Sequence, residues 1–366
     1  MNRFVAANTR RLQIPLTIVG GPKGAGKTTL LRQLLTSSEG RRIAVAFDHG
    51  VASSPSSARV ESMDCASLEL SQGAWRLAPD GDVGTALAAL HSSREQPLPD
   101  HVIVEASASA SPLRMAGYTF LPGFRPGGMI VVVSASEIKW MCDEGTEPDS
   151  LFGDQLRHAE LLLLNRMDEL RVSARPAVRR WLQLRAGRAR LIETEHSCVP
   201  MAMILGADRD HVPRNAIHAQ WSPYFSVSAE AHQQRVFHPR NSEDFRSWLL
   251  SSEHPIDGRA FRDWARTLPD SVVRGDGVLR MLGEPSHQFR FECCGRRWSL
   301  SRGEPWGPTA TPTSWVSLVG FASRVTGGKA QNEITDSSGI EAPAPKHHFR
   351  PPLWRSPSEQ RFGDQP

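Results

Sequence analysis

The stretch Gly21-Pro22-Lys23-Gly24-Ala25-Gly26-Lys27-Thr28 decides the fold of this chain. It matches the pattern G-x-x-x-x-G-K-S/T, and it stands between an apolar strand-like run and a helical pattern that starts at Lys27. In this setting glycines let backbone N–H groups wrap phosphate oxygens, and the first turn of the helix adds favourable partial charge. A chance glycine loop is a poor explanation of this context, so the stretch predicts a phosphate-binding P-loop.

Two side chains of this loop have expected chemical roles. The Lys27 ammonium neutralises β and γ oxygens of a nucleotide, and the Thr28 hydroxyl is a ligand for Mg²⁺. Backbone and first-turn contacts to the nucleotide are expected from the rest of the motif and the residue after it: Gly21, Gly24, Ala25, Gly26 and Thr29.

Around the loop, short β-rich runs alternate with helical patterns from residue 14 to about residue 193. This alternation predicts an α/β fold, a P-loop NTPase with a central, mostly parallel sheet flanked by helices. Strands are expected at 15–19, 43–47, 101–105, 129–133, 161–164 and 190–192. Helices are expected at 27–35, 82–90 and 174–184, and a mobile loop at 48–63, which is rich in Ser, Ala and Pro.

A second pattern begins near Trp221 and predicts a smaller C-terminal α+β domain. One helix is expected to start at Asn241 or Ser242, with Phe245, Trp248 and Leu249 on one face, and another at Asp257 or Gly258. Strands are expected at 278–282, 288–293, 297–300 and 315–319. The Pro-rich, aliphatic-poor end predicts a disordered tail. The expected domains are 14–210, 221–322 and the tail 323–366.

The expected strand 101–105 ends in Glu105, where a P-loop protein places a carboxylate that reaches Mg²⁺ or its water shell. Carboxylates are common at strand ends, so the P-loop is what favours this interpretation. The expected metal ligands are therefore Thr28 and Glu105, and the expected catalytic residues are these two and Lys27.

Asn165-Arg166-Met167-Asp168 follows an apolar run and is similar to the guanine-specific N-K-x-D element, with Arg in place of Lys. The Asp168 carboxylate is expected to accept hydrogen bonds from N1–H and the exocyclic amine of guanine, a pattern that adenine lacks. Asn165 would brace the loop, and the stem and plane of Arg166 would lie along the base. A polar turn after a buried strand is the alternative, and the P-loop favours guanine.

Together these stretches resemble the CobW-type GTPases of the SIMIBI class of P-loop proteins, a group of metal chaperones and metalloenzyme activators. The likeness covers about residues 14–322. The matching stretches are 21–29, 40–45, 102–107, 163–168 and 194–196, with 295–300 ahead of Pro305-Trp306 in the C-terminal module. The resemblance implies that GTP and Mg²⁺ are the cofactors, that Asn165 and Asp168 select guanine, and that a client metalloprotein is a partner.

The chain departs from this family where its members carry Cys-x-Cys-Cys after a glycine, thiolates that bind Zn²⁺, Co²⁺ or a related ion. After Gly73 the corresponding positions hold Ala74, Arg76 and Leu77. Ala and Leu have no donor atom for a metal, and Arg is a permanent cation. Zinc or another transition metal is therefore not expected at the usual family site.

Two further departures concern hydrolysis. The family usually has Asn-Glu-Phe-Gly and further acids after the second strand, where this chain has Asp48-His49-Gly50. Its usual Glu-Thr-Thr-Gly becomes Glu105-Ala-Ser-Ala108, which loses a glycine whose flexible backbone approaches the γ-phosphate. Nucleotide binding is expected to survive better than hydrolysis.

Composition limits the partners and the compartment. The 366 residues carry 43 Lys and Arg against 39 Asp and Glu, an excess too small to indicate nucleic-acid binding. No apolar run approaches the roughly 20 residues of a membrane span, and no secretion signal is recognisable. Five scattered cysteines indicate a reducing, cytoplasmic setting. Cys293 and Cys294, adjacent in an expected strand, are predicted as one core and one surface thiol.

The sequence therefore predicts a GTP-binding protein, a slow GTPase that acts as a nucleotide-gated metallochaperone-like or metalloenzyme-accessory factor with a degenerate metal site. Two alternatives remain open. One is a non-hydrolysing nucleotide-binding regulatory module, and the other is an ATP-dependent P-loop kinase, because a P-loop alone does not specify the acceptor. The Asn165–Asp168 element argues against the kinase.

Overall fold

The computed structural model describes residues 13–37, 41–48, 74–77, 83–92, 98–108, 110–207, 216–223, 236–237, 245–269, 271–307 and 311–321. The expected loop after residue 48 and the expected tail from residue 323 lie outside these ranges. So do the segments on both sides of residues 74–77, where the family metal motif is expected.

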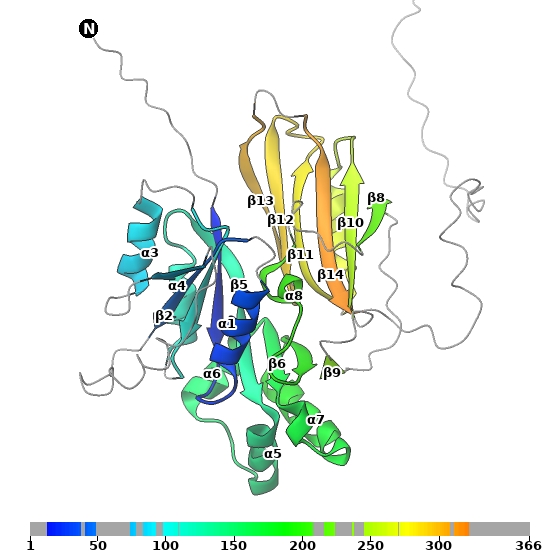
Figure 1. The fold of residues 1–366 in the computed structure, drawn as a ribbon. Helices are drawn as coiled ribbons and strands as arrows, with labels where there is room; N and C mark the ends of the chain where they lie inside the picture. Colours follow the sequence, from blue (N-terminus) through cyan, green and yellow to red (C-terminus); the bar gives the residue numbers. More distant parts are fainter. Residues whose placement is uncertain are drawn as a thin grey trace, which may run out of the picture. The chain divides into compact units, whose positions relative to one another are not determined.

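An eight-stranded sheet in the order β3-β2-β4-β1-β5-β6-β7-β9 forms the first part of the fold, and every strand pair in it is parallel (Figure 1). Its strands are β1 (Ile14–Gly20), β2 (Ile43–Asp48), β3 (Ala74–Leu77), β4 (His101–Ala106), β5 (Phe124–Ser134), β6 (Leu161–Asn165), β7 (Arg190–Thr194) and β9 (Val236–Phe237). The six strands expected from the sequence are all present. The two that were not expected, β3 and β9, are short and lie at the sheet edges.

Helices cover both faces of this sheet because successive strand residues point to opposite sides. Val19 packs with Leu30 and Leu34 of α1, whereas Ile18 packs with Leu87 of α3 in a separate cluster. The helices are α1 (Lys27–Thr36), α3 (Val83–Ser92), α4 (Pro112–Tyr118), α5 (Ala135–Glu144), α6 (Ser150–His158), α7 (Arg175–Arg185) and α8 (Met201–Leu205), with short 3-10 turns η1 (Met167–Glu169) and η2 (Val172–Ala174). The predicted α/β architecture is confirmed.

A mixed six-stranded sheet in the order β13-β12-β11-β14-β10-β8 forms the second part. Its strands are β8 (Ile217–Gln220), β10 (Phe245–Ser252), β11 (Val272–Arg280), β12 (His287–Cys294), β13 (Arg297–Pro305) and β14 (Ser314–Phe321). Helix α9 (Gly258–Arg266) packs Phe261 edge-on against Phe291, with ring centroids 5.2 Å apart. Asp257 caps this helix by accepting from the Ala260 N–H at 2.7 Å, as the sequence predicts.

The helix expected from Asn241 or Ser242 is wrong, because Phe245–Ser252 form strand β10. This strand pairs along its whole length with β14, from Phe245 opposite Phe321 to Ser252 opposite Ser314. The sheet ladder satisfies the backbone groups that a helix would otherwise pair internally, so tertiary pairing overrides the helical spacing of the apolar residues.

The expectation of one core and one surface thiol in β12 is also wrong. Cys293 and Cys294 are 6% and 2% exposed. Their side chains do lie on opposite faces of the sheet. Cys293 belongs to the apolar cluster that contains Phe261 of α9, and Cys294 belongs to the cluster that contains Leu205 of α8. The side that was expected to meet solvent is covered by residues from the first part of the fold.

No helix among the described residues is long and apolar enough to cross a membrane.

Candidate nucleotide-binding site

The predicted site residues meet at the carboxyl ends of three strands of the parallel sheet. The P-loop follows β1, Glu105 is the last residue but one of β4, and Asn165 ends β6. In the sheet β1 lies between β4 and β5, and β6 comes next. The carboxyl ends of parallel strands share one edge, where α/β proteins bind their ligands.

Glycines give the P-loop a backbone path that other residues rarely adopt. Gly21, Gly24 and Gly26 have φ angles of +128°, +78° and +111°. A Cβ atom on Gly21 would lie 2.0 Å from the Val132 carbonyl oxygen, and one on Gly26 would lie 2.3 Å from the Asn165 amide nitrogen. The loop therefore packs too closely for side chains here, and it forms a cradle of backbone that fits phosphate oxygens.

Lys27 begins α1, and its side chain folds back over the loop. Its Nζ donates to the carbonyl oxygens of Gly21 and Pro22, each at 2.9 Å, and the residue is 9% exposed. This geometry places a positive charge beside the cradle. The described first turn of α1 contains no acidic residue and no side-chain cap. Its first N–H groups, which point along the helix axis toward the cradle, are therefore left for a ligand.

Thr28 and Glu105 are adjacent, as the expected metal site requires. The Thr28 hydroxyl donates to Glu105 Oε1 at 3.2 Å. Burial raises the pKa of Glu105, while the positive charge of Lys27 and the Thr28 hydrogen bond oppose the rise. A hydroxyl and a carboxylate are hard oxygen donors of the kind that Mg²⁺ prefers, so the pair fits this ion.

A second carboxylate, which was not expected from the sequence, experiences the charge of the same lysine. Glu137 lies in the first turn of α5 and is partly buried. Burial raises its pKa, and the charge of Lys27 again opposes the rise. Its position directly after β5, one strand from the P-loop, is the signal that could have identified it.

Asn165 connects the P-loop to the loop that follows β7. Its amide nitrogen donates to the Ala25 carbonyl at 2.9 Å, and its side-chain oxygen accepts from the Ser197 N–H at 2.7 Å. The Ser197 hydroxyl in turn donates to the Gly26 carbonyl at 3.0 Å. With 2% exposure, Asn165 is a buried brace, the arrangement that was expected of it.

Backbone strain is concentrated in this region. Among the described residues, the non-glycine positions with positive φ are Arg166, His196 and Ser197, at 62°, 54° and 56°. Gln33 of α1 holds one of them by donating to the His196 carbonyl at 2.9 Å. Strained backbone that neighbours hold in place is typical of functional sites. Ser197 and Gln33 were not predicted from the sequence. The nearest indication was the family match at residues 194–196, which carried no expected role.

Arg166 and Asp168 occupy the turn after β6. The Arg166 guanidinium donates to the Gly24 carbonyl at 3.0 Å and pairs with Glu169 at 3.1 Å. Ser136 of α5 donates to the other Glu169 oxygen at 2.9 Å, which fixes the turn further. Asp168 is exposed and bonds to none of the residues that the structure describes, so its carboxylate is accessible to a ligand.

Asp48 at the end of β2 is tied to the helix that follows Glu105. Its carboxylate pairs with Arg114 of α4 at 2.5 Å and is 8% exposed. In the sequence, Asp48 belongs to the stretch that replaces the family's Asn-Glu-Phe-Gly and further acids after the second strand. Here it joins the end of β2 to the start of α4.

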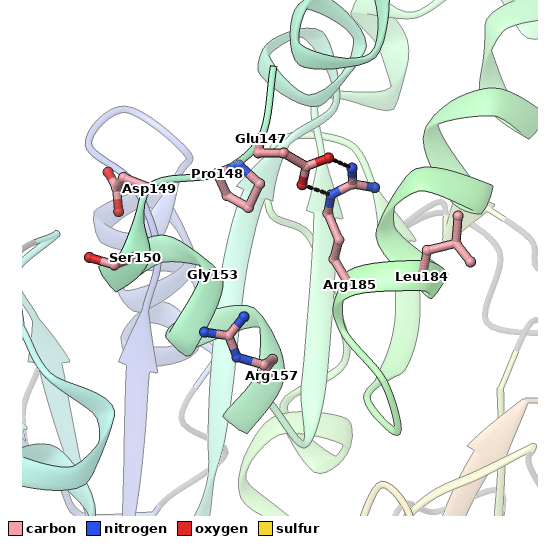
Figure 2. A pocket seen from close by; sticks show the side chains of 8 residues that line it. All are labelled: Glu147, Pro148, Asp149, Ser150, Gly153, Arg157, Leu184 and Arg185. Atoms are coloured by element: carbon pink, nitrogen blue, oxygen red, sulfur yellow. Dashed lines mark hydrogen bonds and ion pairs between the residues drawn. The ribbon is translucent and has the colours of Figure 1, made fainter. Parts of the chain in front are cut away.

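A cavity of about 270 Å³ lies away from these residues, between the start of α6 and the end of α7. Figure 2 shows Glu147 and Arg185 in direct contact in its lining, with Arg185 Nε donating to Glu147 Oε2 at 2.8 Å. Arg157, also in its lining, pairs with Asp154. None of the sequence-predicted site residues lines this cavity.

The positions that replace the family cysteines lie in an edge strand. Ala74–Leu77 form β3, which pairs in parallel with β2, Arg76 opposite Val45. Within the described ranges, no three His, Cys, Asp or Glu side chains are grouped to hold a metal ion.

Comparison with known proteins identifies both parts of the chain. Residues 15–192 match the nucleotide-binding domain of the CobW/HypB/UreG family, and residues 245–334 match the cobalamin synthesis protein cobW C-terminal domain. The zinc chaperone CobW of Sinorhizobium sp. is 25% identical over 351 residues, which cover 87% of this chain and 96% of the relative. The zinc chaperone YeiR of Escherichia coli is 23% identical over 52% of this chain and 61% of its own length.

Among solved structures, the Zn(II)-bound YjiA GTPase from E. coli aligns with a TM-score of 0.40 and 20% identity, over 84% of this chain and 94% of that one. The chain belongs to the CobW/HypB/UreG family of P-loop GTPases and carries the CobW C-terminal domain.

Proposed function

We propose that this chain binds GTP with Mg²⁺ at the edge formed by the P-loop, Glu105 and residues 165–168. The observation that carries the proposal is the pair of hydrogen bonds made by the Asn165 side chain, at the start of the turn that carries Asp168. Its amide nitrogen donates to the Ala25 carbonyl of the P-loop, and its oxygen accepts from the Ser197 N–H, while the Ser197 hydroxyl donates to the Gly26 carbonyl of the P-loop. The base and the phosphates of one nucleotide would then be held by a single braced unit. Lys27 and Thr28 contact the phosphates in this proposal, and Asp168 contacts the guanine.

Bound Mg²⁺ would neutralise charge on the β and γ oxygens, with Thr28 and Glu105 as its ligands. Lys27 supplies the second positive charge, and the N–H groups at the start of α1 supply hydrogen bonds. Among the described residues, Asp48 is paired with Arg114, and Ala108 stands where the family has a glycine, so neither position is set up to orient an attacking water. We therefore propose slow hydrolysis.

The proposed role is that of a GTP-gated accessory factor for a metalloprotein. Relatives named as zinc chaperones support a role linked to metal supply. Ala74, Arg76 and Leu77 offer no thiolate at the family's cysteine positions, so we propose that the usual metal element is degenerate in this chain.

The deciding experiment compares GTP, ATP and Zn²⁺ binding to the full chain, with and without Mg²⁺, and then measures GTP turnover. GTP binding in preference to ATP, weak Zn²⁺ binding and slow turnover support the proposal. Preference for ATP would favour the kinase alternative. GTP binding without any turnover would favour the regulatory module, and tight Zn²⁺ binding would contradict the degenerate metal site.

Glu105→Gln tests the Mg²⁺ assignment and has a second consequence for stability. Because burial raises the pKa of Glu105 above its ordinary value of 4.5, the folded protein binds this proton more tightly than the unfolded chain. The carboxylate then lowers stability above the folded pKa, and stability recovers as the pH falls through it. We expect the variant to raise the unfolding midpoint of the nucleotide-free protein at neutral pH.

The same variant loses a charged Mg²⁺ ligand. We expect about tenfold weaker GTP binding with Mg²⁺, the effect of losing one charge-assisted contact, and little change when EDTA removes the ion. Thermal unfolding across acid and neutral pH and nucleotide titrations in both buffers measure the two effects. If Mg²⁺ increases the GTP affinity of the variant as much as it increases that of the unaltered chain, Glu105 is not a ligand.

A further inference from the structure

Gln155 is a polar side chain in an apolar position of α6. It is 1% exposed, and its helix neighbours Phe152 and Leu156 belong to the apolar cluster beneath β5. Burial of a carboxamide costs free energy unless hydrogen bonds replace its contacts with water. Packing alone therefore does not explain a glutamine here.

The bonds of Gln155 go to the segment between Glu105 and α4. Its Nε2 donates to the Ala108 carbonyl at 3.2 Å and to the Ala110 carbonyl at 3.1 Å. The opposite orientation of the amide would direct its oxygen at two carbonyl oxygens, so the chemistry fixes the assignment. Both N–H donors of one side chain thus hold this segment.

The other end of the same amide faces the P-loop strand. Gln155 Oε1 is buried and has no hydrogen-bond partner among the described residues. It lies 3.8 Å from the position that a Cβ atom on Gly20 would take, at the end of β1 directly before the P-loop. Gln155 therefore lies between the strand that enters the P-loop and the segment that follows Glu105.

The segment is fixed at both of its ends by other contacts. Glu105 accepts from Thr28 at one end, and Arg114 in the first turn of α4 pairs with Asp48 beyond the other. Between them one turn bond runs from the Ala110 N–H to the Ser107 carbonyl at 3.0 Å, and Gln155 adds side-chain bonds to the carbonyls of Ala108 and Ala110. Because a trans peptide is planar, holding the Ala110 carbonyl also sets the direction of the Ser111 N–H on the opposite side of the same plane.

We propose that Gln155 is a positioning residue that sets this segment so that its backbone favours a nucleotide with a γ-phosphate over one without. The inference rests on the proposed GTP site, because the segment adjoins Glu105 at the Mg²⁺ and γ-phosphate end of that site. Gln155 touches no nucleotide in this arrangement. It acts through the two carbonyl groups that it holds.

Gln155→Met tests the proposal by keeping the length of the side chain and removing its donors. With Mg²⁺ present, we expect affinity for a non-hydrolysable GTP analogue to fall about tenfold, as for the loss of about one net hydrogen bond, while GDP affinity stays within about twofold. Titrations of both nucleotides on the full chain give the ratio. Gln155→Asn is a second variant, because it keeps the carboxamide on a side chain that is shorter by one methylene. We expect it to lose part of the preference for the GTP analogue over GDP.

Phe152→Leu is the matched control, because it weakens the packing of the same helix without touching the segment. We expect it to lower the unfolding midpoint and to leave the ratio of the two affinities unchanged. An unchanged ratio in Gln155→Met, or an equal loss for both nucleotides, would overturn the proposal. If the unaltered chain binds neither nucleotide, the proposed GTP site itself has failed, and the wild-type titration identifies that outcome.

Discussion

Lys27→Ala is expected to weaken GTP binding by about a hundredfold or more while the protein stays folded. The ammonium lies beside the glycine cradle and donates to Gly21 and Pro22, so it is placed to transfer those bonds to phosphate oxygens. Charge-assisted hydrogen bonds contribute roughly 1.5–3 kcal/mol each, and this lysine is expected to make more than one. Titration calorimetry with GTP and Mg²⁺ measures the loss.

Lys23→Ala is the matched control for this experiment. Lys23 lies in the same loop and is exposed, so its removal takes away the same formal charge without emptying the cradle. Exposed charges contribute little at physiological salt, and we expect an affinity within about threefold of the unaltered chain. Similar losses in both variants would mean that the loop attracts nucleotide only through its general positive charge. Circular dichroism and the unfolding midpoint establish that both variants are folded.

The parallel sheet could be predicted because its strands carry their signal locally. Runs such as 43–47 and 161–164 are continuously apolar, and a strand covered by helices on both faces needs this pattern. The P-loop then fixed the order of a strand, a glycine turn and a helix. The edge strand β3 has only four residues and no such run, so nothing in its sequence separates it from a loop.

The strand β10 shows where local pattern fails. Phe245, Trp248 and Leu249 have helical spacing, and the partner strand β14 that decides their structure begins at Ser314, more than sixty residues later. Pairing over such a distance is invisible in a short window of sequence. The burial of Cys294 has the same cause, since the residues that cover it come from the first part of the fold.

The residues of the candidate site could be predicted where the side chain belongs to a recognisable sequence motif. Lys27, Thr28 and Asn165 lie where the sequence placed them, and the structure brings Glu105 next to Thr28. Residues that act through backbone atoms of distant segments could not be found in this way. Gln155 is an example, because one glutamine in a helix carries no spacing or motif that indicates the two carbonyl groups it holds.

The contacts of Glu169 explain how the turn proposed to bind the base keeps its shape without using Asp168. Glu169 pairs with Arg166 and accepts from Ser136, so one carboxylate of the turn is structural. The adjacent Asp168 is exposed, so its carboxylate is accessible for the role in base binding that we propose. Two neighbouring acids with different duties allow a matched pair of substitutions, Asp168→Asn and Glu169→Gln, each of which removes one negative charge from the same turn.

Asp168→Asn is expected to lower GTP affinity by about a hundredfold and to make xanthosine triphosphate the preferred ligand. In the proposed site the carboxylate accepts from the N1–H and the exocyclic amine of guanine, and losing two charge-assisted hydrogen bonds accounts for a change of this size. Xanthine carries a carbonyl in place of the amine, and the new Asn amide can donate to it. Competition between the two triphosphates on the folded variant measures the inversion. Glu169→Gln should keep the preference for guanine, whatever it does to overall affinity. If Asp168→Asn still prefers GTP, or if both variants shift alike, the base is not held by Asp168 and the guanine assignment is wrong.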